Sequence, residues 1–503
     1  MQILKKIKYI FILIAAFGFA EEDALMIDSC SAHYDGSLVI LSGSVKVEQK
    51  LGKIYAGHMI LTPENGRSKM RFSHLNMQDD VKIELKDGGQ LLCAKADLDY
   101  LTGIGSFSGN ASQEYVIYTE NCTGKEDKKF PVLVKSRKMN IELVRQEKNS
   151  FSQQVSKIKA QQNVTINYNH DFIATSEQAD YQRLESEEEG EMPGHIRLFS
   201  QNLESLCQIT NKNGDLVRSH VIDLDTAKQN LQFSAPSGFL SIDSKENRKE
   251  KIHFESDSLN WDNKQNVLTF SGNVAIRQKD YGDLQGSQQV KLHYTEDAKK
   301  KKIKQIESLG ETILAHIDED KKLVHTLTAY GKVLVDHVHL KTIIESPRDE
   351  KGDVIEGMQI YFNDILGEIY ADSAVLDYQE KEGTVSIEKL LLEGNVRILN
   401  RSSVNPEESE AFLQYALADF VEFFPSSQEM LMSADKTVSL NQRVLFYDKA
   451  NSLQVSAPAV KVRRDAITKR ESIQGIGDVR FSLDGQELEK LRSHFSLEPV
   501  KGV

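Results

Sequence analysis

Residues 371–399 read ADSAVLDYQEKEGTVSIEKLLLEGNVRIL, and the fold can be inferred from this stretch. It opens with a small residue followed by an acidic one, continues through a charged turn, and ends in Gly394 and Asn395 followed by alternating apolar and polar residues. Residues 256–277, SDSLNWDNKQNVLTFSGNVAIR, repeat this order. Because alternation with a period of two is typical of β-strands, the repeated unit is predicted to be two strands joined by a turn.

The second half of this unit recurs along the chain as two apolar, β-branched residues separated by one residue that is usually polar. One face of each such strand is apolar and has to be buried against another layer. The recurring triplets are Val45-Lys46-Val47, Val81-Lys82-Ile83, Val164-Thr165-Ile166, Val274-Ala275-Ile276, Val333-Leu334-Val335 and Val396-Arg397-Ile398.

A turn-forming or small polar dipeptide precedes these triplets, and one also precedes Val479. Glycine accepts a left-handed backbone without steric cost, and Asn and Asp tolerate it, so we predict a bend before each inward-facing pair. The dipeptides are Gly43-Ser44, Asp79-Asp80, Gln162-Asn163, Gly272-Asn273, Gly331-Lys332, Gly394-Asn395 and Gly477-Asp478.

The spacing of the repeats is uneven, unlike that of a solenoid with a fixed repeat length. It favours an all-β fold, a long antiparallel meander folded into stacked sandwich or jelly-roll layers. A parallel β-helix, which also stacks short strands, stays open as an alternative. One helix is predicted, from Glu407 to about Tyr415, because Asn405 and Pro406 fit a cap and a first-turn proline.

The first twenty residues are predicted to be a cleaved signal peptide. Three lysines precede an apolar run from Tyr9 to Phe19, which is shorter than the roughly 20 residues that a membrane-spanning helix needs. A retained anchor is the alternative. Acidic and polar stretches divide the remainder into predicted modules at 21–190, 195–345 and 353–490.

Charge and cysteine content limit the environment and the partners. The formal net charge of −13 would repel nucleic acid at long range, so nucleic acid is not expected as a partner. Four cysteines are compatible with disulfides in an exported chain but do not fix a pairing. They are Cys30, Cys93, Cys122 and Cys207.

Patterns of catalytic and metal-binding sites are weak. His337 and His339 lie on one face of a predicted strand, but no cysteine or third ligand is near them in the sequence, so we predict surface positions. Asp372 and Asp377 could be imagined as an acid and a base, yet their recurrence within the repeat favours structural roles at turns and edges. The sequence therefore predicts no enzyme, no cofactor and no metal site.

The repeat resembles a known family. The pattern Ala-Asp-x-x-x-x-Asp-Tyr at 371–378, followed by Leu-x-Gly-Asn-Val-x-Ile at 392–398, is similar to the OstA-type repeat of the periplasmic lipopolysaccharide-transport proteins of the LptA family. The resemblance recurs around residues 94–110, 162–181 and 256–276.

The family fold is a twisted, open β-jelly-roll whose two sheets enclose an apolar groove for lipid A acyl chains. The resemblance implies tandem modules of this kind forming an elongated antiparallel sandwich, because the chain is much longer than a single-module bridge protein. It also implies a periplasmic protein that binds or bridges lipopolysaccharide and shields its acyl chains during transport to the outer membrane. Other lipopolysaccharide-transport proteins at the inner and outer membranes would be partners through edge strands.

The inward-facing apolar positions are predicted to line this groove. They are Val45, Val47, Val164, Ile166, Val274, Ile276, Val333, Val335, Val396, Ile398, Val479 and Phe481. Two other functions stay open: a structural or adhesive exported β-repeat protein whose core is filled, and a carbohydrate-active β-helix enzyme with carboxylates clustered on one sheet face.

Overall fold

The computed structural model describes residues 26–482 with gaps. The described ranges are 26–49, 52–63, 72–85, 90–99, 102–123, 129–146, 150–168, 172–184, 194–202, 205–211, 213–225, 228, 230–243, 249–278, 282–297, 300–318, 323–363, 367–381, 384–401, 412–434, 443–449, 453–464 and 471–482. The predicted signal peptide lies outside these ranges. Within them every regular element is a β-strand, and no helix has the length and apolar character needed to cross a membrane.

The described residues fall into two compact units. Unit 1 comprises residues 1–241 and 258–266, and unit 2 comprises residues 242–257 and 267–503. The predicted module boundaries near 190 and 350 lie inside these units, and the three-module division stays a prediction.

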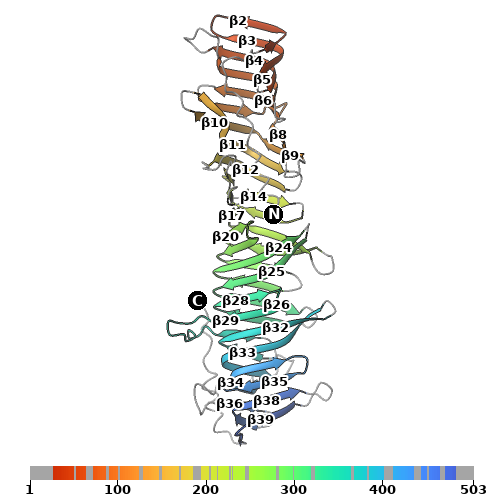
Figure 1. Cartoon of the computed structure of the whole chain (residues 1–503), viewed down its shortest axis with the longest axis vertical. Coiled ribbons are helices and arrows are strands. Elements are labelled where there is room, and N and C mark those ends of the chain that lie inside the picture. The colour runs from red at the N-terminus through yellow and green to blue at the C-terminus, as the bar shows by residue number, and fades with distance from the viewer. Residues whose placement is uncertain are drawn as a thin grey trace. The chain divides into compact units, whose positions relative to one another are not determined.

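The strands of unit 1 are numbered in chain order (Figure 1). They are β1 (Met26–Asp28), β2 (Ser31–Tyr34), β3 (Val39–Gln49), β4 (Gly52–Pro63), β5 (Phe72–Leu85), β6 (Gln90–Asp99), β7 (Ile104–Ser108), β8 (Val116–Thr123), β9 (Lys129–Ser136), β10 (Lys138–Gln146), β11 (Ser150–Tyr168), β12 (Phe172–Arg183), β13 (Gly194–Phe199), β14 (Cys207–Asn211), β15 (Leu216–Ser219), β16 (Val221–Asp225), β17 (Asn230–Ser234), most of β18 (Ser237–Asp243), and β20 (Ser258–Asp262).

Unit 2 holds the remaining strands. They are β19 (Lys249–Glu255), β21 (Val267–Ser271), β22 (Val274–Gln278), β23 (Gly282–Gly286), β24 (Gln289–Asp297), β25 (Lys300–Leu309), β26 (Thr312–Asp318), β27 (Leu323–Ala329), β28 (Lys332–Asp336), β29 (Lys341–Glu345), β30 (Ile360–Asn363), β31 (Gly367–Ala371), β32 (Ser373–Lys381), β33 (Thr384–Arg401), β34 (Phe412–Phe424), β35 (Glu429–Ser433), β36 (Val444–Asp448), β37 (Leu453–Ala457), β38 (Ala459–Arg464), β39 (Glu471–Ile476) and β40 (Arg480–Ser482).

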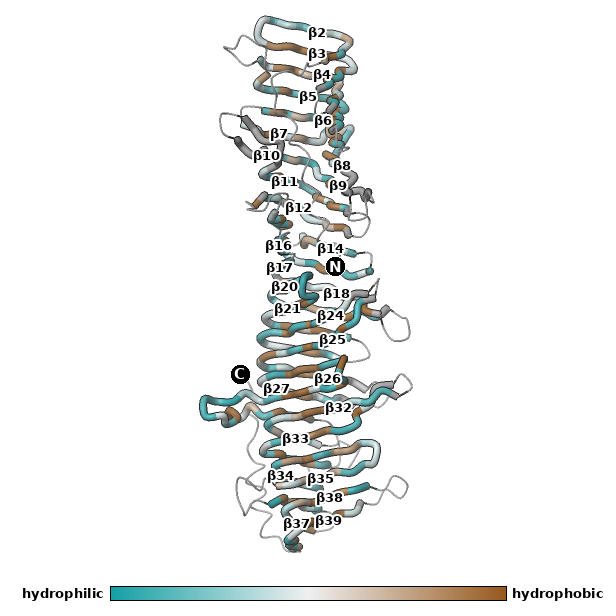
Figure 2. The backbone as a smooth tube through the Cα atoms, viewed as in Figure 1, coloured by the Kyte–Doolittle hydropathy of each residue, from teal (hydrophilic) through white to brown (hydrophobic). Residues whose placement is uncertain are grey.

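The strand pairings are antiparallel throughout these elements, for example β33 with β34 and β3 with β4. This confirms the predicted all-β antiparallel fold and is incompatible with a parallel β-helix. Brown and teal alternate along many strands in Figure 2, as expected when one face of a strand packs inward and the other faces water.

The long strands bend where the sequence predicted it. At Gly394 (φ +76°) and Asn395 (φ +44°), two left-handed residues of β33 lie opposite the single residue Asp419 of β34, which is a β-bulge. The same two-against-one register occurs at Gly43-Ser44, Asp79-Asp80 and Gln162-Asn163. Gly272 and Asn273 are also left-handed and connect β21 to β22.

One predicted bend differs. Gly331 does not have a left-handed φ, whereas Gly310 does, and their backbones are joined by a hydrogen bond from Gly310 N–H to Gly331 O of 2.9 Å. Glycine is still required at position 331, because a Cβ atom there would lie 2.2 Å from the carbonyl oxygen of Glu345.

The bends bring together the two halves of the repeated unit. Asn395 Nδ2 donates to Asp372 Oδ2 at 2.8 Å, and Asn273 Nδ2 donates to Asp257 Oδ2 at 3.0 Å. Asp372 is buried and also accepts from Gln359 Nε2 at 2.6 Å. The acidic residue that opens the unit therefore has a structural role at the bend, as the sequence predicted.

Each bend transfers the chain between two ladders of strands in unit 2. Ladder 1 contains β21, β24, β25, β28, β29, β32, the first half of β33, the second half of β34, β35, β38 and β39. Ladder 2 contains β19, β22, β23, β26, β27, β30, β31, the second half of β33, the first half of β34, β36, β37 and β40.

A common apolar core joins the two ladders. Val333, Leu392 and Met432 of ladder 1 belong to the same buried cluster as Val396 and Phe446 of ladder 2. Two antiparallel layers joined at bends and packed on one core correspond to the predicted jelly-roll-like sandwich.

Two local predictions were wrong. Residues 412–415 of the predicted helix begin strand β34, and residues 402–411 lie outside the described ranges. His337 and His339 lie in the turn after β28, not on a strand. Asp336 Oδ1 accepts from the backbone N–H groups of Val338 and His339, both at 2.9 Å, and its Oδ2 lies 2.8 Å from His339 Nδ1. These hydrogen bonds, led by that from the His339 side chain, lower the pKa of Asp336 to about 2.

Candidate functional site

Unit 2 carries a continuous line of cross-strand apolar neighbours along the inner face of ladder 2, which we call row 2. Every member lies opposite the next in the strand register. Row 2 consists of Phe254, Ile276, Leu284, Leu314, Leu327, Phe362, Ile369, Ile398, Ala416, Phe446, Val455 and Phe481. The members from Ile276 to Ile398 are only partly buried, although Leu327, Ile369 and Ile398 pack on the core cluster.

Ladder 1 carries a matching line on its inner face, which we call row 1. It consists of Leu268, Leu292, Ile306, Val335, Thr342, Leu376, Leu390, Phe423, Met430, Val462 and Ile473. Leu268, Leu292 and Thr342 are buried, and the other members are partly buried. The apolar residues nearest the bends, such as Val333 and Val396, are in contrast fully buried. Along the middle strands of unit 2, exposure of the inner faces therefore increases with distance from the bends.

Polar side chains follow row 2 on the side away from the bends. Asn400 and Gln414 lie one inner position beyond Ile398 and Ala416, and Asn400 Nδ2 donates to Gln414 Oε1 at 2.9 Å. His325 holds the equivalent position beyond Leu327, and its ring stacks on that of Phe362 at 6.4 Å between centroids and 17° between planes. The inner face thus passes from fully apolar at the bends to polar at its far margin.

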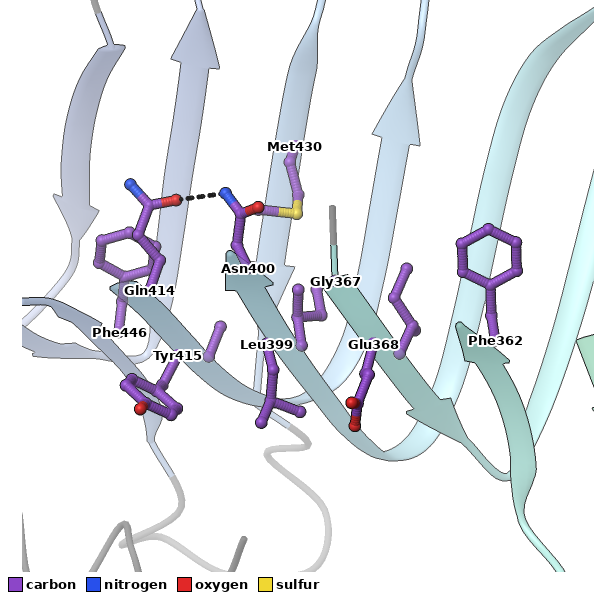
Figure 3. A pocket seen from close by; sticks show the side chains of 12 residues that line it. Phe362, Gly367, Glu368, Leu399, Asn400, Gln414, Tyr415, Met430 and Phe446 are labelled. Carbon is purple, nitrogen blue, oxygen red and sulfur yellow. Dashed lines mark hydrogen bonds between the residues drawn. The ribbon is translucent and has the colours of Figure 1, made fainter. Parts of the chain in front are cut away.

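A cavity of about 220 Å³ lies in this part of unit 2 (Figure 3). Ladder 2 supplies most of its walls, including Phe362, Ile369 and Ile398, and ladder 1 supplies Met430. Its lining is completed by Gly367, Glu368, Leu399, Asn400, Gln414, Tyr415, Ala416 and Phe446. Figure 3 shows Asn400, Gln414 and Met430 on one side of the ladder, and Glu368, Leu399 and Tyr415 on the other.

The outer face of ladder 2 at this point is a polar and aromatic network. The rings of Tyr361 and Tyr370 are 4.8 Å apart, and the guanidinium of Arg397 lies 4.6 Å from the centre of the Tyr370 ring. Burial, and next the negative charge of Glu368, raise the pKa of Tyr370. Tyr370 therefore stays neutral at physiological pH and has a packing role, because a catalytic acid or base needs a pKa near the working pH.

Unit 1 has an equivalent line of residues that is closed. Like row 2, it contains the second apolar residue after a bend, and we call it the unit 1 row. Its members are Val47, Ile54, Ile83, Leu91, Tyr118, Val134, Ile166, Ala174, Ile209 and Val217. All ten are buried, and the most accessible, Ile166, is 9% exposed.

The predicted groove residues fall into three groups. The residues that directly follow a bend, Val45, Val164, Val274, Val333 and Val396, are fully buried, as are Val47 and Ile166. The partly buried residues are Ile276, Val335, Ile398 and Val479. Phe481, on the last described strand, is 61% exposed. The structure thus places Ile276, Ile398 and Phe481 in row 2 and Val335 in row 1, while contact of any of them with a lipid stays a prediction.

Several residues of the cavity were not predicted. Phe362, Ile369, Met430 and Phe446 lie on strands without the Gly-Asn-Val signature, so the motif did not reveal them. The available signal was their alternation with polar or outward-facing neighbours, as in Ile360-Tyr361-Phe362.

Within the described ranges there is no group of three or more His, Cys, Asp or Glu side chains that could hold a metal ion. Cys30, Cys93 and Cys207 are free thiols, and burial raises the pKa of Cys93 to about 12 and that of Cys207 to about 11. The chemistry available in the cavity is therefore apolar contact with a polar margin.

Part of unit 2 matches the model of a known protein family. Residues 253–364 match the family model described as LptA/(LptD N-terminal domain) LPS transport protein. The match begins in β19, ends just after β30, and contains the repeat at 256–276, so the resemblance to the LptA-like family is confirmed there. The repeat at 371–398 lies beyond it.

One similar solved structure is that of LptH from Pseudomonas aeruginosa, described as the LptA homologous periplasmic component of the conserved lipopolysaccharide transport device. The similarity covers 32% of this chain and 89% of that chain, with 15% sequence identity and a TM-score of 0.20. No curated protein sequence matches the chain.

Proposed function

We propose that this protein binds lipopolysaccharide and bridges part of its route to the outer membrane, shielding the lipid A acyl chains between row 1 and row 2 of unit 2. The observation that carries the proposal is the unbroken register of row 2 through and beyond the segment that matches the lipopolysaccharide-transport family. A lipid transporter needs a long apolar surface that is not completely filled by the protein itself.

The energetics of such a surface suit transport. Full burial of a Leu, Ile or Phe side chain contributes roughly 1.5 to 3 kcal/mol, and the partly buried members of row 2 retain some of this area for a ligand. As in conduction through pores, cargo moves when each binding position is favourable but none is much stronger than its neighbours. A row of similar Leu, Ile and Phe residues provides positions of that kind.

The proposal includes the cellular setting. An exported, periplasmic location agrees with the family match and with the basic and apolar N-terminus. Edge strands would receive other transport proteins, because unpaired backbone groups of a strand can accept a further strand. Exposed apolar residues occur on such strands at both ends of the described chain, namely Met26, Tyr34 and Phe481. The role needs no catalysis.

Site-specific photo-crosslinking in cells tests the proposal. A photoreactive residue at Ile276 or Ile398 is expected to label lipopolysaccharide, whereas the same residue at Arg277 or Arg397 is not. These arginines are matched controls, because each is the next or preceding residue on the same strand and points to the opposite face. Equal labelling from both faces would refute binding between the rows.

A structural or adhesive β-repeat protein is the second candidate. The complete burial of the unit 1 row favours it, since a filled core needs no ligand. It predicts that neither Ile276 nor Ile398 labels lipopolysaccharide, while the folded protein and its export are normal.

A further inference from the structure

Equivalent residues are buried to different extents in the two units. Val47 and Ile166 in unit 1 are buried, whereas Ile276 and Ile398, which hold the same place after a bend in unit 2, are partly exposed. The local sequences are closely similar, with a β-branched pair after a left-handed dipeptide. The difference therefore comes from the surrounding packing and not from the repeat itself.

In unit 1 the neighbours across the strands are buried as well. In the unit 1 row all the residues from Val47 to Val217 are buried, including the aromatic ring of Tyr118. A second inner row of unit 1, which contains Met59, Met77 and Phe107, is likewise fully buried. Protein interiors are packed about as densely as organic crystals, so an alkyl chain could enter here only by displacing side chains.

Unit 2 offers space at the equivalent depth. The cavity lies beside Phe362 and Ile398 of row 2, with Met430 of row 1 among its walls. The flexible methionine side chain adapts its shape readily to an apolar neighbour. This property suits the wall of a cavity that holds an alkyl chain only part of the time. The hydrogen-bonded amides of Asn400 and Gln414 border this space and provide polar groups where a chain would be joined to its headgroup.

We infer that the alkyl-chain site of this protein is confined to unit 2, with its best-formed position between β30 and β36, and that unit 1 is a closed β-sandwich which holds no lipid. The inference rests on the proposed function and narrows it. The first candidate function, lipid binding, then applies to unit 2. The second, a structural role with a filled core, then applies to unit 1.

The test compares two aromatic positions in the purified full-length chain. p-Benzoylphenylalanine replaces Phe362 in unit 2 or Tyr118 in unit 1, so that each substitution exchanges one aromatic ring for another. Purified lipopolysaccharide is the probe, and crosslinked adducts are quantified after irradiation. At least tenfold more adduct from Phe362 than from Tyr118 is expected, with far-ultraviolet circular dichroism showing that both variants are folded.

The outcomes separate the inference from the proposed function. Comparable labelling at both positions would retain lipopolysaccharide binding but overturn the confinement to unit 2, as would labelling at Tyr118 alone. Labelling at neither position would overturn both.

A second pair of variants controls for an effect of the probe residue itself. Ala416→Leu places a larger side chain in the cavity wall and should lower adduct formation from the probe at position 362 severalfold. Ala174→Leu in unit 1 should leave that adduct yield unchanged. An undiminished yield with Ala416→Leu would overturn the assignment of the cavity.

Discussion

Asn395 holds the carboxylate of Asp372 through a hydrogen bond of 2.8 Å, so the end of one repeated unit is tied to its own beginning. The pair Asn273 and Asp257 repeats the contact at 3.0 Å. In both pairs the asparagine lies where the chain passes from ladder 1 to ladder 2. The recurring acidic residue and the recurring Gly-Asn therefore stabilise the same bend through one hydrogen bond. This explains why they recur together in the sequence.

Removal of the Asp372 carboxylate should destabilise unit 2. Asp372→Ala removes a buried carboxylate that accepts hydrogen bonds from the side-chain amides of Asn395 and Gln359, and the loss of hydrogen bonds to a charged group costs about 1.5 to 3 kcal/mol. Asp377→Ala is the control, because that carboxylate is partly exposed and its ion pair with Lys341, at 4.0 Å, contributes roughly 0 to 1 kcal/mol. Hydrogen exchange followed by mass spectrometry should show faster exchange around residues 371–374 and 393–396 in the first variant only.

The glycine of the bend should be equally sensitive. In Gly394→Ala the new Cβ would lie 2.4 Å from Asp372 Oδ2, and the left-handed φ itself costs about 1 to 2 kcal/mol for a non-glycine residue. Gly352→Ala measures the backbone term alone, since Gly352 has φ +89° and no atom within 4 Å of an added Cβ. We expect a larger decrease in urea midpoint for Gly394→Ala. Equal decreases would mean that the contact with Asp372 relaxes without cost.

The sequence predicted the bends and the strands well because both depend on local chemistry. Left-handed backbone selects Gly, Asn and Asp, and alternation reports directly on the two faces of a strand. The helix prediction near Tyr415 was wrong because β34 is apolar on both faces, Ala416 inside and Tyr415 outside, so periodicity could not distinguish it from a helix.

The open or closed state of the inner rows could not be predicted in the same way. Val47 and Ile398 follow similar dipeptides, yet one is buried and the other partly exposed. That difference depends on how closely two ladders approach each other, which is set by the sizes of many side chains on strands distant in sequence. The cavity wall formed by Met430 and Phe362 is an example, since no local motif connects them.

Thiol chemistry should report on the closure of unit 1. Burial raises the pKa of Cys93 to about 12, so little thiolate is present at pH 8, and thiolate is the reactive form. Cys30 is exposed. Iodoacetamide at pH 8 should therefore modify Cys30 rapidly and Cys93 only after unfolding, as read by peptide mass mapping. Rapid native labelling of Cys93 would contradict a closed unit 1.

The same pKa has a consequence for stability. Because the folded-state pKa is raised, the contribution of Cys93 is complete below its unfolded value near 9 and is lost as the pH rises toward 12. Cys93→Ala should remove this part of the alkaline destabilisation. If the free energy of unfolding depends on pH in the same way in the wild type and in Cys93→Ala between pH 9 and pH 11, the raised pKa of Cys93 is contradicted.

Enlarging one alanine in each unit should separate an open from a closed interior. Ala416 lines the cavity of unit 2, so the added atoms of Ala416→Leu can enter free space and the variant should lose less than about 1 kcal/mol, or gain stability. Ala174 occupies the fully packed unit 1 row, where Ala174→Leu should cost about 1 to 3 kcal/mol through overpacking. Both alanines are almost completely buried and both are followed on the same inner row by apolar neighbours, which makes them a matched pair. Thermal unfolding measured by circular dichroism gives the comparison without any lipid. If both substitutions are tolerated, unit 1 has unfilled space as well. If both strongly destabilise the chain, the cavity beside Ala416 is too narrow for a leucine side chain and therefore also for the end of an acyl chain.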